Sequence, residues 1–448
     1  MSDQGRLLLS RRDLLKYGGL TAATAAAVGF GPRLVGTILQ PGRALAADRA
    51  PDLKLVGTDS WITLPSNPQI SSSAYGVVHP DSYAPAPYTD YIFGFANATG
   101  LRDDEQFNLK NQAQHSAPMF WAKENQEFRV QLTNVGLAQR PDLFDAHTVH
   151  WHGFKNVIPF FDGEPTGSVS VPQGQTFTYV YVSKDPGTYM FHCHVEDVEH
   201  VHMGMTGLVF VRPAQDGTSQ TYQGSTFTRF AYNDGDGSTG FHREFAMFLS
   251  EVWAEAHWAD AHIQLPEWSD YHADFALLNG RVYPDTLAPS GGSIDPFNVQ
   301  RDANYELIAP AGRPDLKNQP ISSLVTCMEG ESVLLRFANL GFKEAAMTLT
   351  GIKLRVVGRD ATRLRGRDNT DSTYATNTIS LGAGESFDAI FKAPAYQGPG
   401  PYDTYALYNR TYTRVDNLGG GGGGQRTEVR VYPTSAALPA QQIPNQTV

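Results

Sequence analysis

The chain has 448 residues, of which 41% are hydrophobic and 18% charged, and its formal net charge is −11 at pH 7. This length allows two or three domains. The acidic balance makes nucleic acid and anionic membrane surfaces poor partners, because like charges repel. After the N-terminal region no apolar run is long enough to cross a bilayer, so we expect no membrane span in the mature protein.

The first 46 residues predict an export signal. The stretch from Ser10 to Lys16 contains paired arginines and precedes an apolar, alanine-rich run from Leu20 to Phe30. This order is typical of the twin-arginine route, and the small residues from Ala44 to Ala46 suit a cleavage site. Because the segment carries a net charge of +4, its removal changes the formal charge from −11 to −15. We therefore expect a periplasmic or secreted protein.

The rest of the chain predicts an all-β fold. Short alternating or β-branched runs recur, and turn signals rich in glycine and proline separate them. The predicted strands cover residues 128–132, 176–182, 207–211, 332–337, 353–357 and 428–431. Because helical periodicity is scarce outside the signal, β-sandwich domains are the expected architecture.

A change of composition between Pro213 and Arg243 divides the mature chain, since glycine, serine, threonine and aspartate dominate there. We expect a signal peptide over 1–46, a first domain over 47–213, a linker over 214–243 and a second domain over 244–448. A faint repeat supports two copies of one fold, because GQTFTY begins at Gly174 and GESFDA begins at Gly384.

The two cysteines have different surroundings in the sequence. Cys327 has no metal-ligand residue type beside it and is expected to be a small buried apolar residue. Cys193 lies between His192 and His194, which is an unusual place for a structural bridge. One disulfide at most could form, so no disulfide framework is available to an exported chain.

Histidines concentrate in the first domain, where seven of the thirteen lie between His147 and His202. Because side chains alternate along a strand, each of two strands should present two imidazoles to one side and a different ligand to the other. If the strands are neighbours, one side gathers His147 with Cys193. The other side gathers His150, His152, His192 and His194.

His200 and Met205 provide two further ligands beside His147 and Cys193. Two imidazoles, one thiolate and a weak axial thioether form a blue-copper site, whereas zinc prefers a tetrahedral set without methionine. His202 and Met203 are rival ligands. We favour the pair five residues apart, because one short loop after the cysteine must deliver both side chains to the same ion.

At these residues the sequence resembles the multicopper oxidases. It contains His-x-x-His-x-His from His147, then GTYMFHCH from Gly187, then a histidine and a methionine. The specific motifs cover roughly 127–213, and the second half resembles a cupredoxin domain more weakly. The resemblance implies two cupredoxin-like Greek-key β-sandwich domains and a copper cofactor. It also implies a small reducing substrate or metal ion as electron donor, and dioxygen as acceptor.

The resemblance also implies a role for each ligand. The type 1 copper ligands would be His147, Cys193 and His200, with Met205 as the axial ligand. The cluster ligands, and therefore the catalytic residues, would be His150 at type 2 copper and His152, His192 and His194 at type 3 copper. In this family, electrons from the donor enter at type 1 copper and reach the cluster through the cysteine and its flanking histidines.

The resemblance is incomplete in two respects. The type 1 ligands lie in the first domain, as in two-domain oxidases and copper nitrite reductases, which trimerise. The family's trinuclear cluster takes eight histidines, but the first domain offers four, and residues 344–351 of the second contain none. A neighbour in a homotrimer could supply His257, His262 or His272, although their spacing is more typical of structural histidines.

Other functions therefore stay open. A copper nitrite reductase would share the order of type 1 ligands, but His150 occupies that family's acid/base aspartate position and His194 is unexpected there. A non-catalytic type 1 electron carrier or copper-binding protein would lack a complete cluster. The acidic run from Glu196 to Glu199 is typical of a solvated turn, but it could also attract a metal ion or cationic donor to His200.

Overall fold

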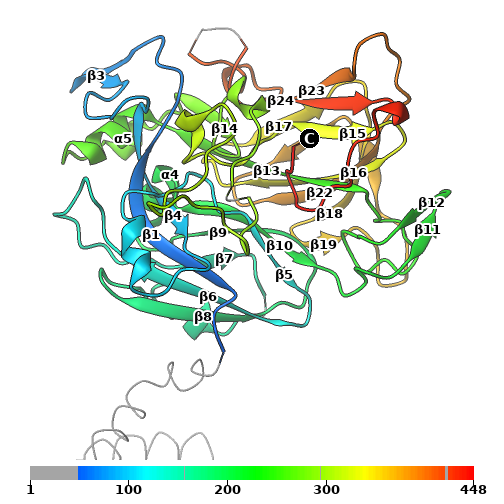
Figure 1. The fold of residues 1–448 in the computed structure, drawn as a ribbon, viewed down its shortest axis with the longest axis horizontal. Coiled ribbons are helices and arrows are strands. Elements are labelled where there is room, and N and C mark those ends of the chain that lie inside the picture. Colours follow the sequence, from blue (N-terminus) through cyan, green and yellow to red (C-terminus); the bar gives the residue numbers. More distant parts are fainter. Residues whose placement is uncertain (1–48, 156, 293, 419–421, 448) are drawn as a thin grey trace, which may run out of the picture. The chain divides into compact units, whose positions relative to one another are not determined.

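The computed structural model describes residues 49–448 with the exception of 156, 293, 419–421 and 448 (Figure 1). The predicted signal peptide lies outside these residues. Residues 51–448 form one compact unit. The described helices are too short or too polar to cross a membrane.

Two four-stranded sheets form the first half of this unit, with the orders β4-β1-β6-β8 and β5-β10-β9-β7. Their strands are β1 (Leu53–Ile62), β4 (Asp90–Asn97), β5 (Phe120–Lys123), β6 (Glu127–Asn134), β7 (His150–His152), β8 (Thr176–Val182), β9 (Gly187–His192) and β10 (Thr206–Arg212). A hairpin of β2 (Ile70–Ser72) and β3 (Gly76–His79) extends from them.

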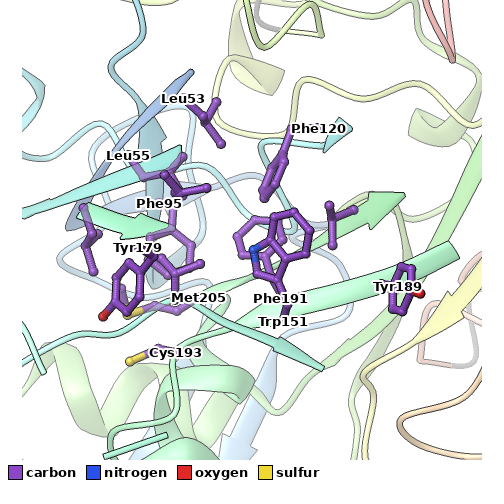
Figure 2. Packing of buried hydrophobic residues seen from close by; sticks show 14 of the residues in the cluster. Leu53, Leu55, Phe95, Phe120, Trp151, Tyr179, Tyr189, Phe191, Cys193 and Met205 are labelled. Atoms are coloured by element: carbon purple, nitrogen blue, oxygen red, sulfur yellow. The ribbon is translucent and has the colours of Figure 1, made fainter. Parts of the chain in front are cut away.

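Large aromatic side chains fill the core of this half. Phe120, Trp151 and Phe191 are fully buried, and the rings of Phe120 and Phe191 lie 4.8 Å apart (Figure 2). Burying each such side chain stabilises the fold by about 1.5–3 kcal/mol. Cys193 and Met205 belong to the same apolar cluster, so these two predicted blue-copper ligands pack within the core.

Two larger sheets form the second half, with the orders β14-β13-β16-β22-β18-β19 and β15-β24-β23-β17-β21, and β20 pairs with β18. The strands of the first sheet are β13 (Arg243–Val252), β14 (Phe275–Leu278), β16 (Ser332–Asn339), β18 (Leu354–Arg359), β19 (Thr362–Arg363), β20 (Tyr374–Thr376) and β22 (Ser386–Lys392). Those of the second are β15 (Val325–Met328), β17 (Ala345–Leu349), β21 (Thr378–Leu381), β23 (Asp403–Asn409) and β24 (Arg426–Tyr432).

The two halves repeat one topology. In the first sheet of each half an antiparallel, a parallel and an antiparallel pair follow one another, so β4-β1-β6-β8 corresponds to β14-β13-β16-β22. The second sheets correspond in the same way, with β5-β10-β9-β7 matching β15-β24-β23-β17. This duplication accounts for the faint sequence repeat at Gly174 and Gly384, which precede β8 and β22.

The predicted all-β fold is confirmed, and each predicted strand falls on an observed one. Two short helices were not expected from periodicity: α4 (Asp197–Met203) and α5 (Ala254–Ala261). The predicted linker also has structure, since it contains the hairpin of β11 (Gln220–Tyr222) and β12 (Ser225–Phe227). It buries Ala231 and Tyr232 against the second half. The exact domain boundaries stay a prediction.

Candidate metal centre

Three side chains from the predicted blue-copper set meet in the first half. The ligand atoms of His147, Cys193 and His200 all lie within 4.8 Å of one another. The sulfur of Cys193 is 3.3 Å from Nδ1 of His200, and the rings of the two histidines have centroids 5.1 Å apart. All three side chains are buried. The structure therefore brings together two imidazoles and one thiol in a space closed to solvent.

Three different elements position this group. Cys193 follows the last residue of β9, and His147 precedes β7 and forms a bridge with Val171. His200 lies on α4, where the sequence predicted a loop. The helix ends at Gly204, whose φ of 117° is a conformation that favours glycine, and the chain then turns back into β10. This helical turn accounts for the five-residue step between His200 and Met205.

The residues fit a copper ion. Both ring nitrogens of His147 are buried without a hydrogen-bond partner among the described residues. Such orphaned nitrogens are costly unless a ligand satisfies them. One thiolate and two imidazoles are donors that suit both oxidation states of copper. Gly57 on β1 leaves room for the set, because a Cβ there would lie 2.7 Å from Cδ2 of His147.

The charges of the group support each other. Burial raises the pKa of the Cys193 thiol, but His200 and His147 outweigh it and hold that pKa well below its ordinary value. Burial lowers the pKa of His200, but the Cys193 thiolate and Asp145 outweigh it and raise that pKa to about 10. The surroundings thus favour the thiolate, which is the form of cysteine that binds a metal.

The structure excludes one of the two alternative ligands, His202 and Met203. His202 points away from this group, because its Nε2 accepts a hydrogen bond of 3.0 Å from the backbone of Trp253 in the second half. Met205 reaches the group, since a Cβ built on Gly57 would meet Cε of Met205 at 3.5 Å as well as the ring of His147. Figure 2 shows the sulfur ends of Met205 and Cys193 facing the same region. Met203 is buried in the same apolar cluster.

The four remaining predicted ligands gather on one side of β7 and β9. The strands pair with His150 opposite His192. The His150 ring lies 5.3 Å from that of His192 and 5.0 Å from that of His194 between centroids. His152 lies 6.0 Å from His192. The prediction that these four rings share one side is therefore confirmed as geometry, although His194 lies just beyond the end of the strand.

Backbone carbonyls orient two of these rings. Nδ1 of His150 donates to the carbonyl of Asp162 at 2.7 Å, and Nδ1 of His192 donates to the carbonyl of Cys193 at 2.7 Å. This arrangement leaves Nε2 of each ring for a metal, as is common for metal-bound histidines. Burial lowers the pKa of His150 and brings that of His192 to about 3, so both imidazoles are neutral at pH 7.

The second half carries no equivalent set among its described residues. By position in the paired strands, Met347 on β17 corresponds to His150, and Asn409 at the end of β23 corresponds to His192. Neither methionine nor asparagine offers an imidazole. The topological repeat thus confirms that the histidine-free stretch at 344–351 is the counterpart of the first cluster.

The histidines beyond β10 have other surroundings. His257 is buried and donates to the carbonyl of Tyr91. His262 lies 2.8 Å from the carboxylate of Asp81 and stacks on Tyr83. Both histidines are thus engaged within their own chain, and the expectation that either serves a neighbouring chain stays a prediction. The His272 side chain is 61% exposed.

Sequence reasoning missed three residues of the centre. The backbone N–H of Thr148 donates to the sulfur of Cys193 at 3.4 Å, and its hydroxyl accepts from the backbone of His194 at 2.8 Å. Oδ2 of Asp145 lies 3.8 Å from Nε2 of His200. Asp145 and Thr148 lie within two residues of His147 in the sequence, and this closeness to a predicted ligand could have identified them. The close approach of Gly57 to His147 depends on packing between strands, and no sequence pattern predicts it.

Known proteins resemble part of this chain in sequence. Residues 103–216 match the family model for multicopper oxidase. Laccase 1 of Metarhizium acridum is 37% identical over 73 residues, which cover 16% of this chain and only 12% of that laccase.

Solved structures share the fold over most of the chain. The blue copper oxidase from Nitrosomonas europaea matches with a TM-score of 0.52 and 18% identity over 86% of both chains. A copper-containing nitrite reductase from Thermus scotoductus matches with a TM-score of 0.51 and 14% identity, covering 88% of this chain and 64% of its own. Residues 103–216 of the chain therefore match the multicopper oxidase family, whose members use copper as cofactor, and the remaining residues share only the fold of the solved structures.

Proposed function

We propose that this protein is an exported copper oxidase, which takes single electrons from a reducing donor at the Cys193 centre and uses them to reduce dioxygen at the four-histidine site. One observation carries the proposal. Cys193 belongs to the buried centre, and its neighbours His192 and His194 belong to the four-histidine group. The peptide chain itself therefore joins the two sites.

Each site has residues suited to hold copper. His147, Cys193 and His200 would bind one copper, with Met205 as a weak fourth ligand. His150, His152, His192 and His194 would bind copper on the other side. Copper bound there supplies one-electron redox chemistry. The protein residues keep water from the first site by burial, and in the second site backbone carbonyls hold Nδ1 of His150 and His192, which leaves Nε2 of these two rings for a metal.

The residues beside His200 favour a positively charged donor, such as a metal ion, over a neutral phenol. Nε2 of His200 lies 3.8 Å from Oδ2 of Asp145, and His200 forms a group with Asp145 and Glu196 whose ligand atoms lie within 4.8 Å of one another. Glu196 is exposed and Asp145 partly so, which gives a cation access from solvent. Two carboxylates beside an imidazole attract cations and position them where electrons would enter.

Kinetics with two donors test this preference. Asp145→Asn combined with Glu196→Gln should raise KM for a metal-ion donor such as Fe²⁺ by about tenfold or more, since two charges are lost. KM of this variant for a neutral phenol should stay within about twofold of the wild-type KM. The control Asp197→Asn should keep KM for both donors within the same limit. Equal changes for both donors would contradict a site for cations.

The number of coppers depends on assembly. Four histidines hold fewer metal ions than the eight of a complete trinuclear cluster, and the second half offers none at the equivalent strand. We therefore propose that a homotrimer supplies the further ligands. His272, which lies beyond β10 and is exposed, is the candidate ligand for a neighbouring chain. Mass measurement in solution together with copper analysis tests this, and a monomer with two or fewer coppers per chain would exclude it.

Oxygen consumption tests the function itself. His150→Ala and His194→Ala should each reduce oxygen uptake with an artificial donor by at least about a hundredfold while the blue absorption remains. The control His242→Ala should leave uptake unchanged, because His242 accepts a hydrogen bond from the backbone of Ser332 and is not one of the predicted ligands. Unchanged uptake in the two variants would exclude the four-histidine site as the catalytic centre.

Two outcomes would assign another function. Reduction of nitrite without oxygen uptake would indicate a nitrite reductase, whose fold the chain shares. A blue protein with one copper and neither activity would indicate an electron carrier.

Export by the twin-arginine route to the periplasm or beyond remains a prediction, and cell fractionation with Arg11→Lys combined with Arg12→Lys tests it. Normal export of that variant would refute it.

A further inference from the structure

A second cavity lies away from the copper ligands. Its volume is about 400 Å³, larger than the cavity of about 280 Å³ beside His152. The β2–β3 hairpin forms one wall, and residues of the segment from Trp253 to Asp274 form the others. A volume of this size is typical of sites that bind small molecules.

Carboxylates determine the charge of this cavity. Four of them line it, namely Glu255, Glu267, Asp270 and Asp274. Its described lining includes no lysine or arginine, and the one basic group is His272, which lies 3.5 Å from Asp274. Glu267 is used locally, because it accepts from the backbone and hydroxyl of Ser269. Asp274 is also used locally, because its Oδ2 accepts from the backbone N–H of Ala254 at 2.8 Å. The negative potential of the cavity therefore rests mainly on Glu255 and Asp270.

Apolar and aromatic groups complete the walls. Ile70, Val78 and Leu265 contribute aliphatic surface, and Tyr75 stacks on Trp258 at 4.8 Å between ring centroids. Trp253 also lines the cavity. Its side chain is buried, and its indole N–H has no hydrogen-bond partner among the described residues. The face of an aromatic ring can accept from such a donor, so this N–H suits a ligand with an aromatic body.

The arrangement distinguishes an organic cation from a metal ion. Among the described residues, the groups with three ligand atoms close enough to hold a metal both lie at His200, and none lies in this cavity. Separated carboxylates over an aromatic and aliphatic surface instead match a cation whose charge lies at one end of an apolar body. Aromatic faces attract such cations in addition to the carboxylates.

We propose that this cavity binds a small organic cation, namely a protonated amine with a flat apolar body. The proposal does not depend on the copper ligands of the first half, since none of them lines the cavity, although His272, which could serve a neighbouring chain, does. The cavity nevertheless adjoins α4, because the backbone N–H of Trp253 donates to His202, two residues after His200. Binding is therefore testable with or without copper.

Calorimetry with benzylammonium tests the proposal, because this probe has the required charge and ring. The wild-type protein should bind it, and binding should weaken as salt screens the carboxylates. Glu255→Gln combined with Asp270→Asn should weaken binding by about tenfold or more. The control Glu344→Gln combined with Asp368→Asn, which changes exposed carboxylates of the second half, should bind as the wild type does.

A neutral isostere separates charge recognition from simple apolar binding. Benzyl alcohol has nearly the same shape as benzylammonium but no charge, and we expect no heat of binding from it. Quenching of tryptophan fluorescence by benzylammonium gives a second measure that needs no activity, and circular dichroism checks that each variant is folded. No binding by the wild type, equal binding of the alcohol, or equal binding by the Glu255 and Asp270 variant would each overturn the proposal.

Discussion

Cys193 and Cys327 are both fully buried, yet their surroundings give them opposite chemistry. Burial raises the pKa of the Cys327 thiol to about 12. At Cys193 burial acts in the same direction, but His200 and His147 outweigh it and hold the pKa far below its ordinary value. A single residue type thus serves as a small apolar side chain on β15 and as a metal-binding thiolate after β9.

Substituting each cysteine separates these roles. Cys193→Ser should remove essentially all of the intense visible absorption of the copper-loaded protein, because that band arises from charge transfer between thiolate and copper. Cys327→Ser should keep the band. Visible and EPR spectra of the two variants provide the measurement, and a blue Cys193→Ser protein would show that another residue supplies the sulfur.

The two buried methionines near this cysteine form a second matched pair. Met205→Leu should raise the reduction potential of the blue centre and preserve its colour, because a weak axial thioether is replaced by a side chain that cannot bind copper. Met203→Leu should leave the potential unchanged. Redox titration of the visible band measures both. A shift in the Met203 variant alone would mean that the two methionines are assigned the wrong way round.

At the scale of elements, β1 limits the space available to His147. A Cβ at Gly57 would lie 2.7 Å from Cδ2 of His147 and 3.5 Å from Cε of Met205, so alanine there must displace the imidazole. Gly57→Ala should lower the free energy of unfolding by about 1–3 kcal/mol, as overpacking of a filled core does. It should also weaken copper binding and alter the visible spectrum.

Gly400→Ala is the control for this substitution. Gly400 is exposed, and a Cβ there would meet its nearest atom, the carbonyl oxygen of Tyr402, at an ordinary 3.5 Å. Denaturant unfolding and copper titration of both variants provide the comparison. An unchanged spectrum in Gly57→Ala would mean that His147 does not need its observed position.

The elements also show where sequence reasoning succeeded. Alternation and turn chemistry identified strands such as β8, whose observed bounds coincide with the predicted range of 176–182. They missed α4, because a seven-residue helix that carries His200 and His202 has too few turns for a periodic pattern. Alternation correctly predicted that His147 and Cys193 lie together, apart from the four histidines, although both residues lie just outside β7 and β9.

At the scale of the whole molecule, a network of buried charges joins the two halves. Arg336 on β16 binds Glu244 at 2.6 Å and Asp388 at 3.1 Å, and it donates to the hydroxyl of Thr188 on β9 at 3.1 Å. The strand that leads to Cys193 is therefore held by the second half. Sequence alone could not reveal this network, because its members are separated by up to 200 residues.

Removing the cation from this network should destabilise both halves together. Arg336→Met leaves two carboxylates in the interior with one counter-charge fewer, and the loss of one partner from a buried ion pair costs about 3–5 kcal/mol. Arg102→Met is the control, because its side chain is 70% exposed and surface pairs contribute about 0–1 kcal/mol. Denaturant unfolding followed by fluorescence measures both, and a loss below about 1 kcal/mol in Arg336→Met would contradict the coupling.

The same network predicts how stability depends on pH. Burial raises the pKa of Glu244, but Arg212 and Arg336 outweigh it and lower that pKa from 4.5 to about 2. A carboxylate with a depressed pKa stabilises the fold fully above its unfolded value, and this contribution is lost as the pH falls towards 2. Arg336→Met raises the pKa of Glu244, so acid unfolding of that variant should begin at a higher pH than in the wild type. Circular dichroism between pH 7 and pH 2 measures the two midpoints, and coincident midpoints would show that Arg336 does not hold Glu244 in its charged form.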